Sequence, residues 1–270
     1  MPILNDLASP SDWIDPDDVP RPVVVYGLVA RDFEGIELDL HRHAKGQVML
    51  VQRGALSCEV EGGLWVVPPG SAIWIPGGAL HSVRITGALE GYNAFVASTI
   101  GLHLPGTCCA VAVSPLLREL LVRSSQLPLL YEEGGTNSRL IAVLVDELAA
   151  AEIENLHLPM PTDARLRRIA DEMLERPRER GTLASWAKHA GMSERTLERR
   201  IGEQTGMSFG RWRQQLGVVL AIRWLAGGAS IQVVAADLGY ESVPSFVTMF
   251  RKMLGTSPGR YMAERYSGGL

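Results

Sequence analysis

Apolar and polar residues follow two different periods along the chain, and the change falls near residue 113. Before it, short segments alternate apolar and polar residues; in Gly35–His43, for example, apolar residues fall on one face and charged residues on the other. Turn residues such as Arg53-Gly54 separate these segments. Short strands at regular spacing favour a sandwich or barrel, so we predict an all-β barrel over residues 22–113. The expected strands are Pro22–Ala30, Gly35–His43, Gln47–Gln52, Ala55–Glu61, Leu64–Val67 and Ile73–Ile75.

From Ser114 the apolar residues recur at helical spacing. Ser114 followed by Pro115 indicates the start of a helix, because serine caps an N-terminus and proline fits the first turn. A second helix is expected over Ser138–Ile153, and residues 155–161 with their prolines are typical of a linker. Both helices have more apolar surface than a linker needs. They therefore either pack on the barrel or form a dimer interface between two copies.

Beyond Thr162 the sequence predicts helices to the end of the chain. A serine or threonine stands at the expected start of four of them, where its hydroxyl can accept from a free backbone N–H. These caps are Thr182, Ser193, Ser230 and Ser242, and a longer helix is expected over Ser208–Ala226. The predicted organisation is an N-terminal arm (1–21), a cupin-like barrel (22–113), a helical linker (114–161) and an all-α domain (162–270).

A helix-turn-helix pattern occurs twice in the helical part. An alanine is followed four residues later by a glycine, Ala187 and Gly191 in the first copy and Ala235 and Gly239 in the second. Both pairs are 48 positions apart. The alanine lets two helices cross closely, the glycine permits a turn with positive φ, and the second helix can enter a DNA major groove. The helix that joins the copies is on the order of 28 Å long, which places the two reading helices near one DNA turn apart.

Charge separates the same two parts. The whole chain has a net charge of −4. Residues 162–270 hold 17 basic and 11 acidic side chains, a net charge of +6, whereas residues 1–161 have a net charge of −10. A basic segment favours a polyanion partner, and an acidic one is repelled by phosphate. We therefore expect the DNA contact to be confined to the C-terminal part.

The second helix of each copy supplies the candidate DNA contacts. In the first copy, Arg195 and Arg199 share a face; arginine can contact guanine through two hydrogen bonds, and Glu198 can accept from cytosine. The second copy has fewer base-reading groups and suits phosphate contact and shape recognition. The predicted contact residues are Ser193, Arg195, Thr196, Glu198, Arg199, Ser242, Val243, Ser245, Thr248 and Arg251.

These motifs resemble the AraC/XylS family of transcription regulators over residues 165–265. The run from Ile231 to Pro258, which includes Gly-Tyr-Glu-Ser242 and Phe250-Arg-Lys, is similar to that family's C-terminal signature. The resemblance implies a bacterial protein that binds double-stranded promoter DNA through both motifs, usually activates transcription and contacts RNA polymerase. The sequence departs from the family at Val243-Pro244 and Thr248, where many members carry polar or arginine contacts.

Four residues of the barrel form a candidate metal site. His41 and His43 lie two apart on one strand and so point to the same side, and His81 and Gln47 can complete the set. Three imidazoles suit Zn, Ni, Fe or Mn. The spacing resembles two cupin motifs, with Gln47 where that family usually has glutamate. Two interpretations stay open, a divalent metal or a polar small-molecule pocket with buried histidines. Candidate pocket residues are Trp65, Trp74 and Tyr92.

Two classes of function follow from these features. The first is a one-component regulator, not an enzyme, whose barrel senses a small molecule or a metal. The second is a metal-dependent cupin enzyme tethered to a DNA-binding module, which Gln47 in place of an acidic ligand disfavours. The three cysteines form no C-x-x-C pattern, which fits a reducing cytoplasm. No signal-peptide pattern or membrane-length apolar run is found.

Overall fold

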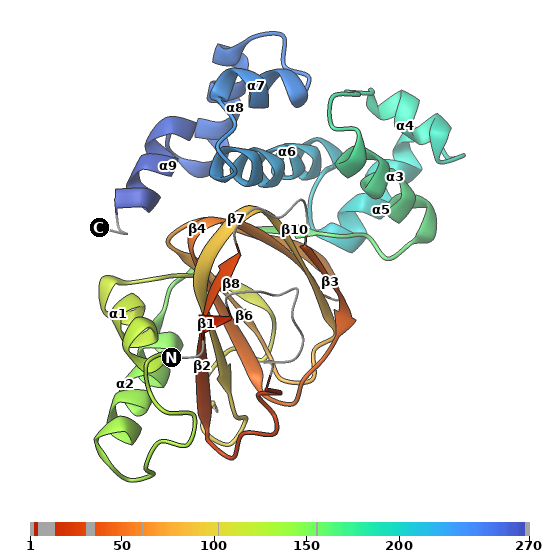
Figure 1. The fold of residues 1–270 in the computed structure, drawn as a ribbon. Coiled ribbons are helices and arrows are strands. Elements are labelled where there is room, and N and C mark those ends of the chain that lie inside the picture. Colours follow the sequence, from red (N-terminus) through yellow and green to blue (C-terminus); the bar gives the residue numbers. More distant parts are fainter. Residues whose placement is uncertain are drawn as a thin grey trace. The chain divides into compact units, whose positions relative to one another are not determined.

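The computed structural model describes residues 3–4, 14–30, 36–60, 62–101, 103–154 and 156–267. The chain divides into two compact units: a sheet unit (1–61, 67–156 and 265–270) and a helical unit (62–66 and 157–264). The predicted combination of a β-rich N-terminal part and a helical C-terminal part is confirmed (Figure 1). Gly35 of the first cupin-like motif and most of the predicted N-terminal arm lie outside the described residues.

Strands of the sheet unit follow the order β1-β2-β7-β4-β6-β8-β9, and β3 also pairs with β7. β1 and β2 pair in parallel, while β7 pairs antiparallel with β2, β3 and β4. The bounds are β1 Ile3–Leu4, β2 Val23–Ala30, β3 Ile36–His41, β4 Gly46–Val60, β6 Ser71–Ile75, β7 His81–Val96, β8 Cys109–Ala112 and β9 Ile153–Glu154.

β4 is one long strand, although the sequence predicts two strands in its place. The prediction fails because Arg53-Gly54 is typical of a turn. In the structure Gly54 has a φ of 82°, and the register with β7 shifts between Val51 and Ala55. These are the marks of a β-bulge, which bends the strand while pairing continues on both sides.

The two faces of the sheet carry different residues, because the pleat sends alternate residues to opposite sides. One face carries an apolar cluster that includes Val48, Leu50 and Trp74. Helices α1 (Pro115–Ser124) and α2 (Thr136–Ala150) belong to this cluster through Leu121 and Leu144 and lie beside the sheet in Figure 1. The buried sides of these helices therefore pack on the sheet, one of the two alternatives that the sequence leaves open.

The helical unit confirms the predicted caps. At each of the four positions, the serine or threonine hydroxyl accepts from the backbone N–H three residues on, and Ser208 caps a fifth helix in the same way. Gly206 and Gly255 end two of the helices with φ of 70° and 78°, the left-handed conformation of a helix C-terminus. The bounds are α3 Ala164–Glu175, α4 Leu183–His189, α5 Glu194–Thr205, α6 Phe209–Ala226, α7 Ile231–Asp237, α8 Val243–Leu254 and α9 Pro258–Ser267.

α6 joins two groups of helices, with α3, α4 and α5 at one end and α7 and α8 at the other (Figure 1). Its Trp212 Nε1 donates to the carbonyl oxygen of Pro159 at 2.7 Å. Pro159 ends β10 (His157–Pro159), which pairs antiparallel with β5 (Gly63–Val67). This short strand falls inside residues 155–161, where the sequence indicates only a linker. None of the described helices is both long and apolar enough to cross a membrane.

Candidate DNA interface and metal centre

Two helix pairs of the helical unit have the geometry that the repeated motif predicts. α4 and α5 form the first pair, and α7 and α8 form the second. The turn glycines Gly191 and Gly239 have φ of 65° and 70°, a left-handed conformation that glycine adopts without strain. Ala187 and Ala235 are each 2% exposed, as expected where two helices cross closely.

The two reading helices, α5 and α8, begin in the same way. Ser193 caps α5 and Ser242 caps α8. Each cap hydroxyl also lies 2.9 Å from a second hydroxyl three residues on, Thr196 Oγ1 in α5 and Ser245 Oγ in α8. Paired hydroxyls beside free N–H groups at a helix N-terminus suit hydrogen bonds to phosphate oxygens or base edges.

The predicted contact residues lie mainly on the outer faces of these helices. The inner faces are buried, through Leu197 and Ile201 in α5 and through Phe246 and Phe250 in α8. Three predicted residues, Thr196, Glu198 and Val243, are partly buried. The exposed ones are Ser193, Arg195, Arg199, Ser242, Ser245, Thr248 and Arg251. Their contacts with bases and phosphates stay predictions.

Two of the base-reading candidates in α5 have partners within the unit. Glu198 Oε1 accepts from the backbone N–H of Phe209 at the start of α6, at 3.3 Å. Arg199 Nη1 lies 2.7 Å from Glu203 Oε1. Among the described residues Arg195 has no hydrogen-bond or ion-pair partner, so its guanidinium is the group of α5 that is most available for a base.

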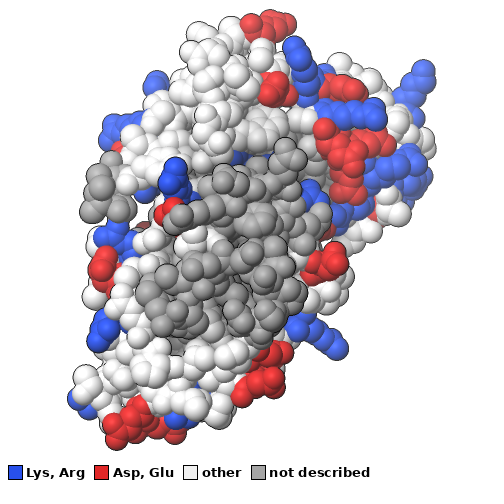
Figure 2. Space-filling model, viewed as in Figure 1, with Lys and Arg blue, Asp and Glu red and all other residues white. Residues whose placement is uncertain are grey.

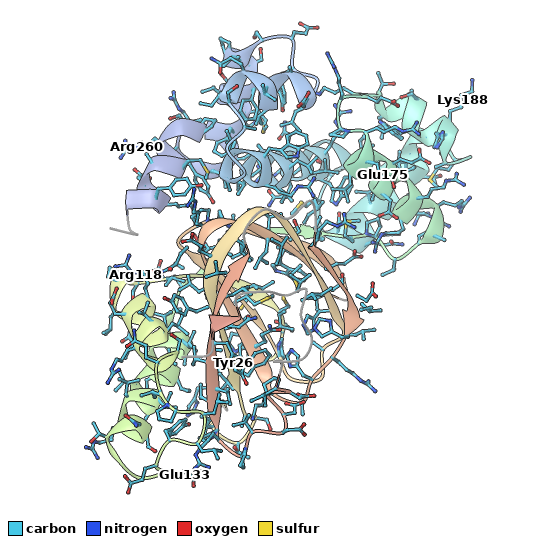
Figure 3. The ribbon with its side chains drawn as sticks, viewed as in Figure 1. Tyr26, Arg118, Glu133, Glu175, Lys188 and Arg260 are labelled. Carbon is cyan, nitrogen blue, oxygen red and sulfur yellow. The ribbon has the colours of Figure 1, made fainter. Side chains whose placement is uncertain are left out.

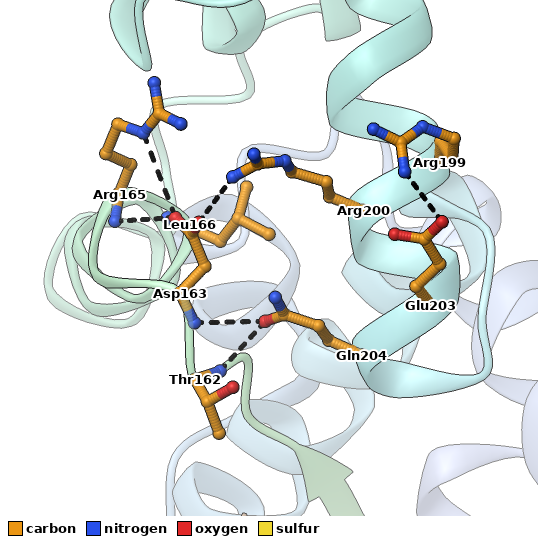
Figure 4. A network of polar contacts seen from close by, with 8 residues as sticks. All are labelled: Thr162, Asp163, Arg165, Leu166, Arg199, Arg200, Glu203 and Gln204. Atoms are coloured by element: carbon orange, nitrogen blue, oxygen red, sulfur yellow. Dashed lines mark hydrogen bonds and ion pairs between the residues drawn. The ribbon is translucent and has the colours of Figure 1, made fainter.

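A polar network fixes α5 against the start of α3 (Figure 4). Asp163 Oδ1 accepts from the backbone N–H of Leu166, and its Oδ2 lies 2.5 Å from Arg200 Nη1. Gln204 Oε1 accepts from the backbone N–H groups of Thr162 and Asp163 at 3.0 and 3.1 Å. These contacts join residues some 40 positions apart, so no local sequence pattern reveals them. These contacts fix the orientation of the reading helix α5 relative to α3.

The three predicted histidines come together in the sheet unit. The candidate ligand atoms of His41, His43 and His81 all lie within 4.8 Å of one another. His41 ends β3 opposite His81, the first residue of β7. His81 is fully buried, His43 is half-buried and His41 is the most exposed of the three. Burial lowers the pKa of His81 to about 4, so its ring is neutral, as a metal ligand must be.

Backbone carbonyl groups orient all three rings. Nδ1 of His41, His43 and His81 lies 2.7, 2.5 and 2.9 Å, respectively, from a carbonyl oxygen two residues away in the chain. A carbonyl oxygen can only accept, so each Nδ1 carries a proton and each neutral ring presents a lone pair at Nε2. This is the arrangement in which a metal-binding histidine is held by its second nitrogen.

Gln47 adds a fourth acceptor to the cluster. Its Oε1 lies 3.0 Å from His43 Nε2 and 3.2 Å from His81 Nε2. Its amide nitrogen donates to Asn93 Oδ1 at 3.1 Å, which turns the oxygen toward the rings. With the protons on Nδ1, these facing atoms are all acceptors, and a cation between them would satisfy them together. Asn93 was not predicted, because the sequence did not indicate how far the strand that begins at His81 extends.

The predicted pocket aromatics lie in different surroundings. Trp74 and Tyr92 pack in the apolar cluster beneath α1 and α2, and Trp74 Nε1 donates to the carbonyl oxygen of Pro105 at 2.7 Å. Gln47, adjacent to Val48 of that cluster, points to the other face of the sheet. Trp65 stacks on His157 with 4.4 Å between ring centroids. A role for these aromatics in ligand binding stays a prediction.

Known proteins and family models match both parts of the chain. A model described as a helix-turn-helix domain matches residues 186–264, and one described as an AraC-like ligand-binding domain matches residues 26–94. The HTH-type transcriptional regulator NimR of Escherichia coli (strain K12) is 42% identical over 225 residues, which is 83% of this chain and 82% of that protein. RipA of Corynebacterium glutamicum is 33% identical over 111 residues, 41% of this chain and 34% of that protein.

Among solved structures, the DNA-binding domain of AdpA in complex with a target DNA is 31% identical, with a TM-score of 0.35, and the match covers 37% of this chain and 91% of that chain. Two helix-turn-helix motifs that follow a ligand-binding domain define a transcription regulator that binds DNA. Identity of 42% across most of both chains makes the family plain. The chain belongs to the AraC family of helix-turn-helix transcription regulators.

Proposed function

We propose that this regulator binds promoter DNA with α5 and α8 in two successive major-groove segments, and that a divalent metal bound at His41, His43, His81 and Gln47 is its effector. The observation that supports the metal is the convergence of three Nε2 lone pairs and one amide oxygen on one point. Such a donor set fits Zn, Ni, Fe or Mn and leaves positions open for a further small ligand.

Metal binding would affect the sheet because the metal ligands come from different strands. His41 belongs to β3, Gln47 to β4 and His81 to β7, while His43 lies in the loop before β4. One ion would therefore tie three strands together and stabilise the folded unit in proportion to its affinity. A change in the stability of these strands is the physical signal that an effector supplies.

Elemental analysis tests the metal. Protein purified without chelator is expected to carry about one divalent ion per chain. His43→Ala should lose most of it, because each ligand of a small site contributes strongly to affinity. His103→Ala is the matched control, since His103 is exposed and lies outside the cluster. Metal-free wild-type protein, or unchanged metal content in His43→Ala, would contradict the proposal.

We assign the barrel a sensing role rather than a catalytic one. The metal-ligand cluster found among the described residues consists of three histidines and no carboxylate. It therefore supplies no acidic ligand and no carboxylate general base beside the candidate ion. Oxygen- or water-dependent turnover of an organic compound by the metal-loaded protein would favour the alternative of a tethered cupin enzyme. Co-purification of an organic ligand without metal would instead identify a small-molecule effector.

In-vitro selection from random duplexes tests the DNA-reading part. The expected product is a sequence with two short determinants about one helical turn apart. Arg195→Ala should relax the preference at one base pair of the first determinant, with a cost of about 1–3 kcal/mol there. Selection that yields no preferred sequence would overturn base reading by α5 and α8.

Two protein partners complete the proposal. A second copy of the chain is proposed to pack on the outer side of α2, where Val143 is 45% exposed beside an apolar groove lined by Pro22, Ile100 and Ala142. Sedimentation equilibrium measures this association, and a monomer at all concentrations would rule it out. RNA polymerase is proposed as a partner on family membership, and in-vitro transcription with purified polymerase distinguishes activation from repression.

A further inference from the structure

The basic side chains of the helical unit fall into two groups. Most arginines in α3, α5 and α9 form ion pairs with acidic neighbours, for example Arg167 with Asp171 and Arg260 with Glu264. Figure 2 shows such charges interleaved over the α3–α5 region, and Figure 3 shows Lys188 and Arg260 at distant ends of the unit. Within the described part of the chain, in contrast, no carboxylate forms an ion pair with Arg176, Arg180 or Arg213.

These three arginines line one hollow. It holds about 400 Å³ of space between the side chains, open solvent at its mouth included. Its walls come from the loop between α3 and α4, from α6, and from the turn of the second helix-turn-helix motif at Tyr240. Glu179 is the one acidic side chain that lines it, so positive charge dominates.

Stacking and hydrogen bonds hold the arginines of the hollow in place. The Arg180 guanidinium carbon lies 4.0 Å from the centroid of the Tyr240 ring. Arg213 Nη1 donates to the carbonyl oxygen of Gly181, the residue after Arg180. The turn that precedes Tyr240 is close as well, since a Cβ added at Gly239 would lie 2.7 Å from the Arg178 carbonyl oxygen. The loop is therefore a fixed bridge between the two motifs.

The guanidinium groups of the hollow lie near one another, and no carboxylate of the described residues forms an ion pair with them. Burial lowers the pKa of Arg213, and the charge of Arg180 lowers it further. Guanidinium groups without a carboxylate partner form a set of donors suited to an oxyanion.

The hollow lies between the two parts of the motifs that approach DNA. The loop leads into Thr182, the cap of α4, and the first helix of such a motif crosses the DNA backbone. Tyr240 stands two residues before Ser242, the cap of the reading helix α8. A duplex that receives α5 and α8 in successive major-groove segments would pass its intervening backbone across this region.

We propose that Arg180 and Arg213, with Arg176 at the rim, bind one backbone phosphate of the DNA between the two major-groove segments. This contact rests on the proposed docking of both reading helices. It carries no sequence information itself. It sets where the backbone lies between α5 and α8, and so fixes the spacing at which the two helices read.

Salt dependence of binding to a mixed-sequence duplex tests the contact. Each phosphate that a protein neutralises adds about 0.9 to the slope of log affinity against log salt. Arg180→Gln should lower that slope by about 1 and weaken binding roughly tenfold at low salt. Arg178→Gln is the matched control, because it removes the same charge from the same loop but does not line the hollow. Arg180→Lys should retain most of the slope.

Equal slopes for Arg180→Gln and Arg178→Gln would overturn the proposal, since the change in slope would then come from the overall charge of the protein and not from a contact in the hollow. Loss of slope in Arg180→Lys would also overturn it, because the ring contact with Tyr240 would then explain the effect. This duplex needs no preferred sequence, so the test stands even if selection shows no base reading by α5 and α8.

Neutral phosphates locate the contact on the selected duplex. Among single methylphosphonate substitutions between the two determinants, one should weaken DNA binding by the wild-type protein roughly tenfold and leave binding by Arg180→Gln unchanged. The same substitution should weaken binding by Arg178→Gln as much as binding by the wild type. A scan in which every substitution acts equally on all three proteins would contradict a phosphate site in this hollow.

Discussion

At the scale of single residues, the two motifs are less alike than their sequences indicate. Gly191 and Gly239 stand at the same place in the two turns and share a positive φ. Gly191 has open space where a side chain would project, whereas Gly239 faces the Arg178 carbonyl oxygen. One glycine is required for its backbone conformation alone, and the other also for a close approach between chain segments.

Alanine substitutions at these two glycines should therefore differ in cost. Gly191→Ala is expected to lower the free energy of unfolding by about 1–2 kcal/mol, the cost of a left-handed conformation for an L-residue. Gly239→Ala should cost about 1–3 kcal/mol more, because its Cβ meets a backbone atom that cannot turn away. Denaturant unfolding followed by far-UV circular dichroism measures both. Equal costs would show that the loop before α4 moves aside freely.

Local signals explain how well the structural elements could be predicted. Helix starts depend on one cap residue and its neighbours, and Ser242 with Pro244 defines the start of α8 correctly. Strands depend on distant partners, so the extent of β7 was not predicted and the bulge at Gly54 was taken for a turn. The histidine set was predicted because its members carry distinctive chemistry. Asn93 and the Asp163–Gln204 contacts have no such local mark.

The short pair of β5 and β10 contains a buried group that titrates. His157 stacks on Trp65, its Nε2 is buried without a partner among the described residues, and a Cβ at Gly63 would lie 2.1 Å from that atom. Burial lowers the pKa of His157 below its usual 6.5. The unfolded chain then binds more protons than the folded one in mildly acidic solution. Stability from this group is present above about pH 6.5 and falls as the pH decreases toward the folded pKa.

His157→Gln should reduce this acid sensitivity. Between about pH 7.5 and pH 5.5, the wild type is expected to lose more unfolding free energy than the variant, whose side chain does not ionise. Thermal unfolding of both proteins across that range measures the difference. An identical pH dependence would mean that His157 is not held neutral in the folded state.

At the scale of the whole molecule, the length of one helix determines what a single chain can read. α6 has 18 residues, which corresponds to about 27 Å, and it separates the two motifs by a distance comparable to a DNA turn of about 34 Å. Both reading helices can then act from one side of the duplex. The spacing between the two halves of the DNA site is therefore a property of the monomer.

A half-turn insertion in the selected DNA site tests this spacing. About 5 bp between the two determinants turns the second to the far side of the duplex, so only one reading helix can stay in its groove. We expect affinity to fall to that of a single determinant, and a full-turn insertion of about 10 bp to restore little of it, because α6 does not lengthen. Footprinting and titration measure both. Retained affinity after the half-turn insertion would refute simultaneous reading by one chain.

The alternation of side chains along the strands has a consequence for how such a protein can evolve. Gln47 and Asn93 serve the histidine cluster, while their neighbours Val48 and Ala94 support α1 and α2 from the opposite face. Adjacent codons in one gene would thus be subject to separate selection, one for the chemistry of the proposed metal site and the next for packing. A point mutation at Gln47 or Asn93 would then alter the proposed site and leave the packing of α1 and α2 intact.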